Sequence, residues 1–373
     1  MRKKVLILSE AFGNGHTKAA EALAQVISLQ EPSVQIHIIE IGKMLHPAIN
    51  DLVLRIYKQS ITTFSFLWKK IYDHLSKPNH TTPNWLQSLI YQLLHRNLDK
   101  VLKQIDPDIV ICTHPFSSSS LSRLKRRGYQ VRLCTVITDF HVHQVWAQPE
   151  VDIYMASNEE VLRQLVLFGI SEQKIVVTGI PVKSDFWQKL NKLEARKSLH
   201  LKNLPTVLVM GGGLGLGGIK DIADALIKWK DDIQFIICTG SNQALKTSLE
   251  NNVRFRHPHI VILGYVNIIH QLLDAADVLI TKPGGLTCFE ALTKGIPMLI
   301  YGPIPGHEEY NCEHLVGRDL AIQIRNKHDV DSWIEKLLLF PEAFKGLYEN
   351  IKQFQQKNDP LAGAKVVLDL LAR

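Results

Sequence analysis

Short runs of apolar and β-branched residues recur along the chain, each followed by a polar or glycine-rich turn and then by a stretch with helical periodicity. Near the amino terminus, Val5 to Ser9 and Val34 to Ile39 are predicted strands on either side of a helix over Thr17 to Ser28. Further strands are predicted at Asp108 to Thr113, Leu133 to Ile137 and Ile153 to Ala156. Repeated β-α units of this kind favour a parallel sheet.

The second half repeats this alternation. Its predicted strands are Thr206 to Met210, Phe235 to Cys238, Ile260 to Leu263, Val278 to Thr281 and Met298 to Tyr301. Because 373 residues exceed the usual size of one domain, we expect an α/β protein with two parallel-sheet domains. The expected divisions are an N-terminal domain over 1–185, a linker over 186–204, a C-terminal domain over 205–356 and a terminal helix over 357–373 that could cross back to the first domain.

The alternation breaks between Met44 and Lys103, where helical periodicity comes with many aromatic and basic residues. The aromatic ones are Tyr57, Phe64, Phe66, Trp68, Tyr72, Trp85 and Tyr91. Residues 1–150 hold 18 basic and 11 acidic groups, whereas residues 151–373 hold 25 of each, so the net charge of +7 lies in the first half. Aromatic rings beside lysines favour an anionic membrane surface over nucleic acid. Packing of the rings in a core is the alternative.

The segment from Thr281 to Asn311 is a candidate anion site. A strand runs into the turn Lys282-Pro283-Gly284-Gly285, and a helix over Leu286 to Thr293 follows. Backbone N–H groups at a helix N-terminus bind anions such as a diphosphate, and glycines let the ligand approach. Glu290, one to two turns into the helix, is placed to accept hydrogen bonds from a ribose diol.

The first predicted helix opens with a second candidate site. His16 follows the turn after the first strand, and the helix dipole there lowers an imidazole pKa, which suits a general base; a capping histidine is the alternative. Asp139 follows the strand over Leu133 to Ile137 and could orient His16, replace it as base, or only bond its own turn. His141 and His143 lie nearby, but no second cluster of ligands accompanies them, so we expect a polar acceptor-site loop rather than a metal site.

Other classes of site are not supported. The glycine run over 211–218 has no following Gly-Lys-Ser or Gly-Lys-Thr, so it is not a Walker loop. Asp329-Val330-Asp331 is expected to cap a helix over Ser332 to Leu339 rather than to hold a metal. The five cysteines are scattered and mostly in apolar sequence, which indicates reduced core residues.

Taken together, these motifs resemble the monogalactosyldiacylglycerol synthase and processive diacylglycerol glucosyltransferase family. The resemblance covers nearly the whole chain. It rests on GNGHTKAA at 13–20, TDFHVHQVW at 138–146, TGIPV at 178–182, MGGGLGLGG at 210–218, GYV at 264–266, KPGGLTCFEAL at 282–292 and PIPGHEEYN at 303–311. Relatives often have a further glycine where this chain has Asn14, which can also adopt a left-handed conformation.

The resemblance implies a GT-B fold, in which two Rossmann-like domains face each other across a cleft. It implies that 264–266 contact uracil, the two glycines at 284 and 285 the diphosphate, and Glu290 the ribose. The residues expected to bind the donor are Gly15, Gly212, Gly213, Gly264, Tyr265, Val266, Lys282, Gly284, Gly285, Thr287, Glu290, Pro305, Glu308 and Asn311. His16 and Asp139 are the candidate catalytic residues.

The expected function is inverting transfer of glucose or galactose from a UDP-sugar to diacylglycerol or a glycosyl-diacylglycerol, without a required metal or other cofactor. The expected location is cytoplasmic, at the inner face of the cell membrane. The alternatives are a UDP-N-acetylglucosamine transferase acting on a lipid-pyrophosphate acceptor, a hydrolysing UDP-sugar epimerase, and a non-catalytic UDP-sugar sensor at the membrane. The epimerase would not need the basic aromatic half.

Overall fold

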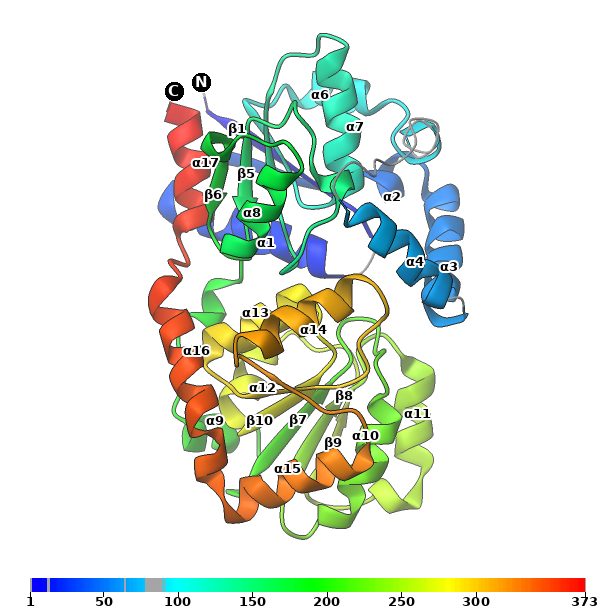
Figure 1. Ribbon diagram of the computed structural model, residues 1–373, viewed down its shortest axis with the longest axis vertical. Coiled ribbons are helices and arrows are strands. Elements are labelled where there is room, and N and C mark those ends of the chain that lie inside the picture. The colour runs from blue at the N-terminus through cyan, green and yellow to red at the C-terminus, as the bar shows by residue number, and fades with distance from the viewer. Residues whose placement is uncertain (1, 12–13, 64, 78–88, 90, 373) are drawn as a thin grey trace. The chain divides into compact units, whose positions relative to one another are not determined.

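The computed structural model describes residues 2–11, 14–63, 65–77, 89 and 91–372 (Figure 1). The chain divides into two compact units. Unit 1 comprises Met1–Ser184, Pro305–His307 and Asn358–Arg373, and unit 2 comprises Asp185–Ile304 and Glu308–Lys357. Each unit is built around a six-stranded parallel sheet, as the alternation of strands and helices predicts.

The sheet of unit 1 has the strand order β2-β1-β3-β4-β5-β6. Its strands are β1 (Lys4–Ser9), β2 (Gln35–Glu40), β3 (Ile109–Cys112), β4 (Arg132–Val136), β5 (Ile153–Ala156) and β6 (Ile175–Val177). The first five are confirmed predictions, and β1 and β3 are nearly solvent-free, which explains their continuous apolar runs. The short edge strand β6 was not predicted, because its three residues give too little pattern.

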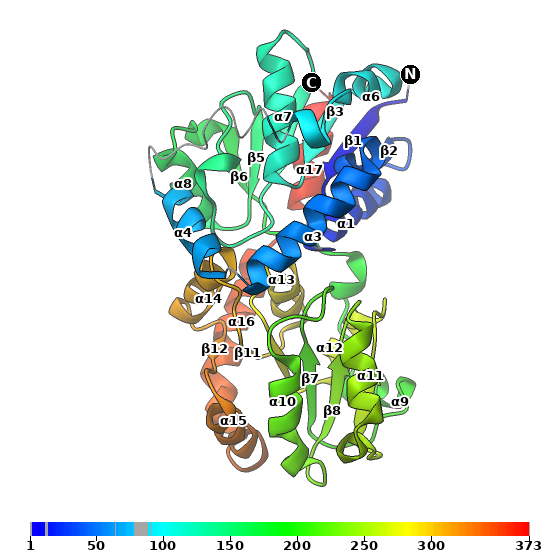
Figure 2. The same cartoon turned by 90° about the vertical axis from the view of Figure 1, so that its right-hand side faces the viewer.

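The helices of unit 1 include an insertion between β2 and β3. The helices are α1 (Asn14–Gln30), α2 (Ile41–Leu45), α3 (Pro47–Thr63), α4 (Ser65–Leu75), α6 (Leu98–Ile105), α7 (Pro115–Arg126), α8 (Glu159–Leu167) and α17 (Ala362–Ala372). Figure 2 shows α3 and α4 as separate helices beside the sheet of this unit. The terminal helix α17 packs on α1, where a Cβ built on Gly363 would lie 3.3 Å from Leu23 Cδ1.

The sheet of unit 2 has the strand order β12-β11-β10-β7-β8-β9. Its strands are β7 (Thr206–Met210), β8 (Gln234–Cys238), β9 (Ile260–Leu263), β10 (Val278–Thr281), β11 (Met298–Ile300) and β12 (Ile322–Gln323). The five predicted strands are confirmed, and only the two-residue β12 was missed.

Helices accompany the strands of unit 2. They are α9 (Lys192–Ser198), α10 (Ile219–Leu226), α11 (Gln243–Asn251), α12 (Ile269–Ala275), α13 (Gly285–Lys294), α14 (His307–Gly317), α15 (Lys327–Leu339) and α16 (Lys345–Lys357). The helix predicted over Ser332 to Leu339 begins earlier, at Lys327, and Asn326 is its N-cap, accepting a hydrogen bond of 3.0 Å from Asp329 N. Asp329 lies in the first turn, where its Oδ2 accepts a hydrogen bond of 2.7 Å from Arg325 N and so contributes to capping, as expected. The side chain of Asn326 thus satisfies an N–H group that the helix leaves free.

Both sheets have a topological switch point, where the strand order reverses. In unit 1 the first strand β1 lies between β2 and β3, and in unit 2 the first strand β7 lies between β10 and β8. Open α/β sheets bind ligands at the carboxyl ends of the strands beside such a point. The loops that follow β1, β3, β7 and β10 are therefore the places to look for function.

Candidate active site

In unit 1, His16 lies in the first turn of α1, at the carboxyl edge of the sheet. Its ring Nδ1 lies 2.8 Å from the carbonyl oxygen of Thr113, which follows β3, and 2.8 Å from the hydroxyl oxygen of Thr138, which follows β4. Three loops from three strands therefore fix one imidazole ring.

These contacts also define the tautomer of His16. A carbonyl oxygen only accepts hydrogen bonds, so the contact with Thr113 places the ring proton on Nδ1. The lone pair is then on Nε2, which has no hydrogen-bond partner among the described residues. A neutral ring with a free, oriented Nε2 is the form that a general base needs.

Neighbouring imidazoles are held in the neutral form. Burial lowers the pKa of His16, and the charge of Asp139 opposes that shift. Burial lowers the pKa of His114 well below its ordinary value, and the same cause brings His141 to a pKa of about 4 and His143 to a pKa of about 3. The rings of His16 and His114 meet edge to face, with centroids 4.6 Å apart. The edge of unit 1 is therefore rich in uncharged imidazole at neutral pH.

The loop after β4 carries Asp139 together with His141 and His143. The backbone oxygen of Asp139 accepts a hydrogen bond of 2.5 Å from Ser157 Oγ, which fixes the turn. Tyr72 of α4 approaches the same loop: its hydroxyl oxygen lies 3.4 Å from His141 Nδ1, and its ring meets that of His143 edge to face at 5.1 Å. The helical insertion therefore forms part of this edge.

In unit 2, the turn after β7 is built from glycines in left-handed conformation. Gly212, Gly215, Gly217 and Gly218 all have positive φ, which residues with a side chain adopt only with strain. A Cβ on Gly215 would lie 1.9 Å from the Thr239 carbonyl oxygen, so no other residue fits there. Left-handed backbone and close packing against the protein's own atoms therefore explain why this turn is built from glycine.

The turn after β10 leads into α13, whose N-cap is Gly284. A glycine cap has no side chain, so no cap hydrogen bond occupies the first N–H groups of the helix. The side chain of Lys282 crosses the neighbouring glycine turn: Cε would lie 3.1 Å from a Cβ on Gly212, and Nζ 3.9 Å from one on Gly284. An ammonium group and a helix N-terminus together are suited to a diphosphate.

Two predicted donor residues on α14 hold this turn. Glu308 is buried, forms an ion pair with Lys282 and accepts a hydrogen bond of 2.9 Å from Ile304 N. Asn311 is also buried and donates a hydrogen bond of 3.0 Å to the carbonyl oxygen of Pro283. Both side chains therefore bind the protein's own turn in this structure.

Most of the other predicted donor residues lie in unit 2, whereas Gly15 and Pro305 belong to unit 1. Glu290 is half-buried in the second turn of α13, and Thr287 lies in its first turn. Gly264, Tyr265 and Val266 follow β9, and the side chain of Tyr265 is 48% exposed. Gly213 lies in the turn after β7, where its carbonyl oxygen accepts a hydrogen bond of 2.9 Å from Ser241 N. Gly15 is in the first turn of α1 in unit 1, and Pro305 lies between β11 and α14.

Sequence reasoning missed Thr113, Thr138 and Tyr72 as members of the unit 1 edge. Thr113 is the last residue of one predicted strand and Thr138 directly follows another, which is the signal that could have found them. Tyr72 was noted only as one aromatic residue among many, and its partners are about seventy positions away. Phe64, Trp85 and the side chains of Tyr57 and Trp68 lie outside the described residues.

The described residues offer neither a metal site nor a disulfide. Within the part of the chain that the structure describes, no group of three or more His, Cys, Asp or Glu residues is placed to hold a metal ion. All five cysteines are buried and free, as expected. None of the described helices has the length and apolar character that crossing a membrane requires.

Family models match both halves of the chain. Residues 16–182 match the monogalactosyldiacylglycerol (MGDG) synthase model, and residues 206–365 match the glycosyltransferase family 28 C-terminal domain. A processive diacylglycerol beta-glucosyltransferase of Bacillus cereus (strain 03BB102) is 31% identical over 355 residues, which are 92% of this chain and 90% of the relative. The enzyme of the same name from Bacillus thuringiensis (strain Al Hakam) is 32% identical over 357 residues, with the same two coverages.

Solved structures show the same fold at lower identity. Acinetobacter baumannii MurG matches with a TM-score of 0.63 and 16% identity over all of both chains. UDP-N-acetylglucosamine 2-epimerase from Neisseria meningitidis, bound to UDP-GlcNAc, matches with a TM-score of 0.61 and 14% identity over 99% of each chain. The fold is therefore α/β of the GT-B type, as predicted. By its similarity over 92% of its length, the chain belongs to the family of monogalactosyldiacylglycerol synthases and processive diacylglycerol glucosyltransferases, and so to the glycosyltransferases.

Proposed function

We propose that the protein transfers a hexose from a UDP-sugar to the hydroxyl group of diacylglycerol or a glycosyl-diacylglycerol. The observation that carries this proposal is the similarity to processive diacylglycerol beta-glucosyltransferases over 92% of the chain. The matched regions include the carboxyl edges of both sheets, one proposed to bind the donor and the other proposed to remove the proton. The relatives' name makes glucose the first donor to test.

Unit 2 is assigned the donor. The free N–H groups at the N-terminus of α13 and the ammonium group of Lys282 bind the diphosphate and stabilise the negative charge that builds up as UDP leaves. Lys282 is paired with Glu308 in this structure, so donor binding places the diphosphate in competition with that carboxylate. Glu290 accepts hydrogen bonds from the ribose hydroxyls.

Unit 1 is assigned proton removal. Nε2 of His16 takes the proton of the acceptor hydroxyl as its oxygen attacks the anomeric carbon, and the bond from that carbon to the UDP oxygen breaks. Attack on the face opposite the leaving group inverts an α-linked donor to a β-linked product, in agreement with the name of the relatives. Asp139 stabilises the imidazolium that forms, since its charge raises the pKa of His16.

The test is a donor-by-acceptor assay. Purified protein is incubated with UDP-glucose, UDP-galactose or UDP-N-acetylglucosamine and with vesicles that contain diacylglycerol, and lipid products are identified by mass spectrometry. We expect hexosyl-diacylglycerol with a β linkage, formed equally well after EDTA treatment. UDP binding without any glycolipid would support the non-catalytic sensor, and transfer only to a lipid pyrophosphate would support the other transferase.

We also propose that the helical insertion contacts the membrane that contains the acceptor. Ile49, Leu52 and Ile56 are spaced i, i+3, i+7 on α3 and are 36%, 57% and 58% exposed. On α4, Phe66 is 69% exposed, with Lys70 Nζ 4.6 Å from its ring centroid. An exposed apolar stripe with nearby lysines suits an anionic lipid surface.

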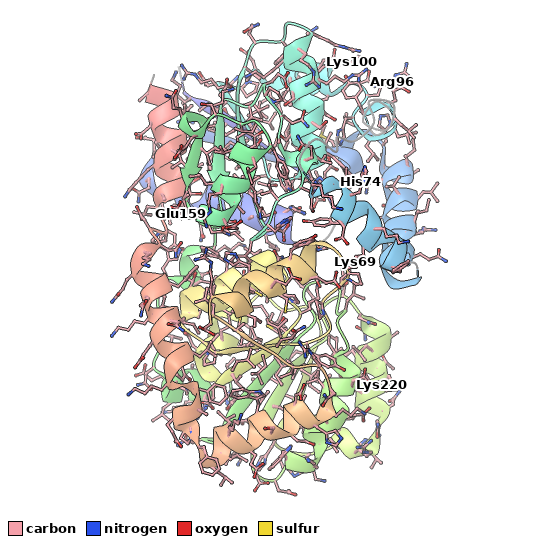
Figure 3. The ribbon with its side chains drawn as sticks, viewed as in Figure 1. Lys69, His74, Arg96, Lys100, Glu159 and Lys220 are labelled. Atoms are coloured by element: carbon pink, nitrogen blue, oxygen red, sulfur yellow. The ribbon has the colours of Figure 1, made fainter. Side chains whose placement is uncertain are left out.

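Basic side chains also extend from unit 1. Lys69 and His74 extend from α4, and Arg96 and Lys100 from the segment around the start of α6 (Figure 3). Arg96 and Lys100 are exposed, so their charges are available to lipid headgroups. The interfacial reading therefore has both apolar and cationic support.

Vesicle sedimentation tests this surface. The double variant Leu52→Asp, Ile56→Asp should weaken binding to phosphatidylglycerol vesicles by roughly tenfold or more, because two apolar side chains no longer enter the interface. Leu167→Asp on α8 is the matched control, since Leu167 is 69% exposed and lies elsewhere on unit 1. Equal loss in both variants, or no recruitment of the unchanged protein at low salt, would contradict the proposal.

A further inference from the structure

Glu10 and His95 form a buried pair that the proposed reaction does not use. Glu10 directly follows β1, six positions before His16, and neither Glu10 nor His95 is accessible to solvent. His95 Nε2 lies 2.5 Å from Glu10 Oε1, and His95 Nδ1 lies 2.5 Å from Ser120 Oγ on α7. Carboxylate, imidazole and hydroxyl are thus in one hydrogen-bonded row inside unit 1.

The same carboxylate also reaches the start of the helical insertion, which we define as residues 41–95. Glu10 Oε2 accepts a hydrogen bond of 3.3 Å from the backbone N–H of Gly42 on α2. A Cβ built on Gly42 would lie 3.1 Å from Glu10 Oε2 and 2.8 Å from Oδ1 of Asn50, a residue of α3 that is 1% exposed. Glu10 therefore holds the insertion near its beginning, through Gly42, and at its end, through His95.

The middle of the insertion approaches the loop over residues 138–146, which we call the acceptor loop. Tyr72 of α4 contacts His141 and His143, which follow β4. A shift of the insertion relative to Glu10 would accordingly move Tyr72 relative to the loop that carries Asp139. The contacts of Glu10 with Gly42 and His95 and those of Tyr72 with His141 and His143 all lie within unit 1.

The chemistry of the buried Glu10–His95 pair favours a positioning role over a purely stabilising one. Burying a carboxylate and an imidazole costs desolvation energy that apolar side chains of similar volume would not incur. The hydrogen bonds among Glu10, His95 and Ser120 instead fix the relative orientation of these groups, because hydrogen bonds require defined distances and angles whereas apolar contacts do not. Directional hydrogen bonds at Gly42 and His95 therefore orient the two ends of the insertion relative to β1.

We propose that Glu10 and His95 are positioning residues that fix the helical insertion on the catalytic edge of unit 1 and thereby place Tyr72 at the acceptor loop. The insertion is then part of acceptor selection rather than only a membrane attachment. This inference rests on the proposed function for its kinetic consequence. Its structural consequence is that the hydrogen bonds of Glu10 determine how well the acceptor loop is ordered. This consequence is independent of the proposed function.

The kinetic test compares conservative variants. His95→Gln keeps a donor toward Glu10 but lacks the second ring contact, and Ser120→Ala removes the hydroxyl partner of Nδ1. Both variants should raise the KM for diacylglycerol roughly tenfold, because Tyr72 is then misplaced at the acceptor loop. Both should leave the Kd for UDP unchanged. Ser118→Ala is the matched control, because Ser118 is also a buried serine of α7 but bonds Thr135 instead, at 2.9 Å. A lower Tm with an unchanged acceptor KM would overturn the proposal.

A double variant and hydrogen exchange complete the test. In a Tyr72→Ala background, His95→Gln should add little to the acceptor KM, because His95 acts through the position of Tyr72. Additive effects of the two substitutions would overturn the proposal. In His95→Gln, amides of residues 41–56 and 138–146 should exchange faster, while those of α10 and α13 stay unchanged. If the unchanged protein forms no glycolipid, the proposed function fails, but unchanged exchange at 138–146 would by itself overturn the positioning role.

Discussion

The carboxyl edges of the two sheets occupy the same topological position but carry different groups. In unit 1, the loops after β1, β3 and β4 bring side chains together around His16, and the neighbouring groups are mostly uncharged imidazoles. In unit 2, the loops after β7 and β10 offer backbone N–H groups, left-handed glycines and the ammonium group of Lys282. Under the proposed function, the same architecture moves a proton at one edge and binds an anion at the other.

The difference follows from what each task requires physically. A proton acceptor needs one ring held in one tautomer, which the carbonyl oxygen of Thr113 provides. A diphosphate needs several donors spread over a surface, which only an exposed backbone supplies without crowding. Removing a side chain should therefore have its largest effect on turnover in unit 1 and on donor affinity in unit 2.

The strongest test of this contrast is His16→Ala. Loss of the base should lower kcat by about 10²–10⁴-fold, while the KM for the UDP-sugar and the Kd for UDP stay close to their original values. Steady-state kinetics and calorimetric titration with UDP measure the two quantities. His328→Ala on α15 is the control, because His328 is exposed. Near-normal turnover of His16→Ala would transfer the role of base to Asp139.

The matching change in unit 2 is Lys282→Ala. A charge-assisted contact with phosphate contributes about 1.5–3 kcal/mol, so the Kd for UDP should rise roughly 10- to 150-fold. Glu308 would also lose its cation, so Tm should fall, and Lys282→Arg should recover part of both losses. Lys352→Ala, at an exposed position of α16, should leave UDP affinity unchanged. An unaltered Kd in Lys282→Ala would remove Lys282 from the diphosphate site.

Glu290→Ala tests the proposal that α13 binds the ribose as well as the phosphates. Loss of the hydrogen bonds should cost about 1–3 kcal/mol in UDP affinity. The sharper measurement compares UDP with 2′-deoxy-UDP: the unchanged protein should prefer UDP, and Glu290→Ala should discriminate less between them. Glu335→Ala on α15 should preserve the discrimination. If Glu290→Ala distinguishes the two ligands as well as before, Glu290 does not bind the 2′-hydroxyl.

The elements of both sheets were predictable because their signals are local. Buried parallel strands such as β1 and β7 are short apolar runs, and the turns after them are marked by glycine, histidine or proline. The strands that were missed, β6 and β12, have three and two residues, and such edge strands are set by pairing with a neighbour. The positions of Gly284 and Gly285 at the start of α13 followed from the same local reasoning.

The connections between distant residues were not predictable in this way. The contact of His16 with Thr138 spans 122 positions, and that of Glu10 with His95 spans 85. Both depend on the order β2-β1-β3-β4, which a sequence of strands does not determine by itself. The roles of Glu308 and Asn311 in holding the Lys282 turn depend on how α14 packs, which no motif contains.

The smallest expected effect is a pH shift in unit 1. His16 must be neutral to accept a proton, and burial lowers its pKa, so kcat/KM should be level at neutral pH and fall only below pH 6.5, the ordinary value for histidine. The charge of Asp139 raises the pKa of His16, so Asp139→Asn should move this acidic limb to still lower pH. A pH profile of kcat/KM from pH 5 to 8 shows the difference. If Asp139→Asn instead abolishes activity across the neutral plateau, Asp139 is the base and the imidazole of His16 only orients it.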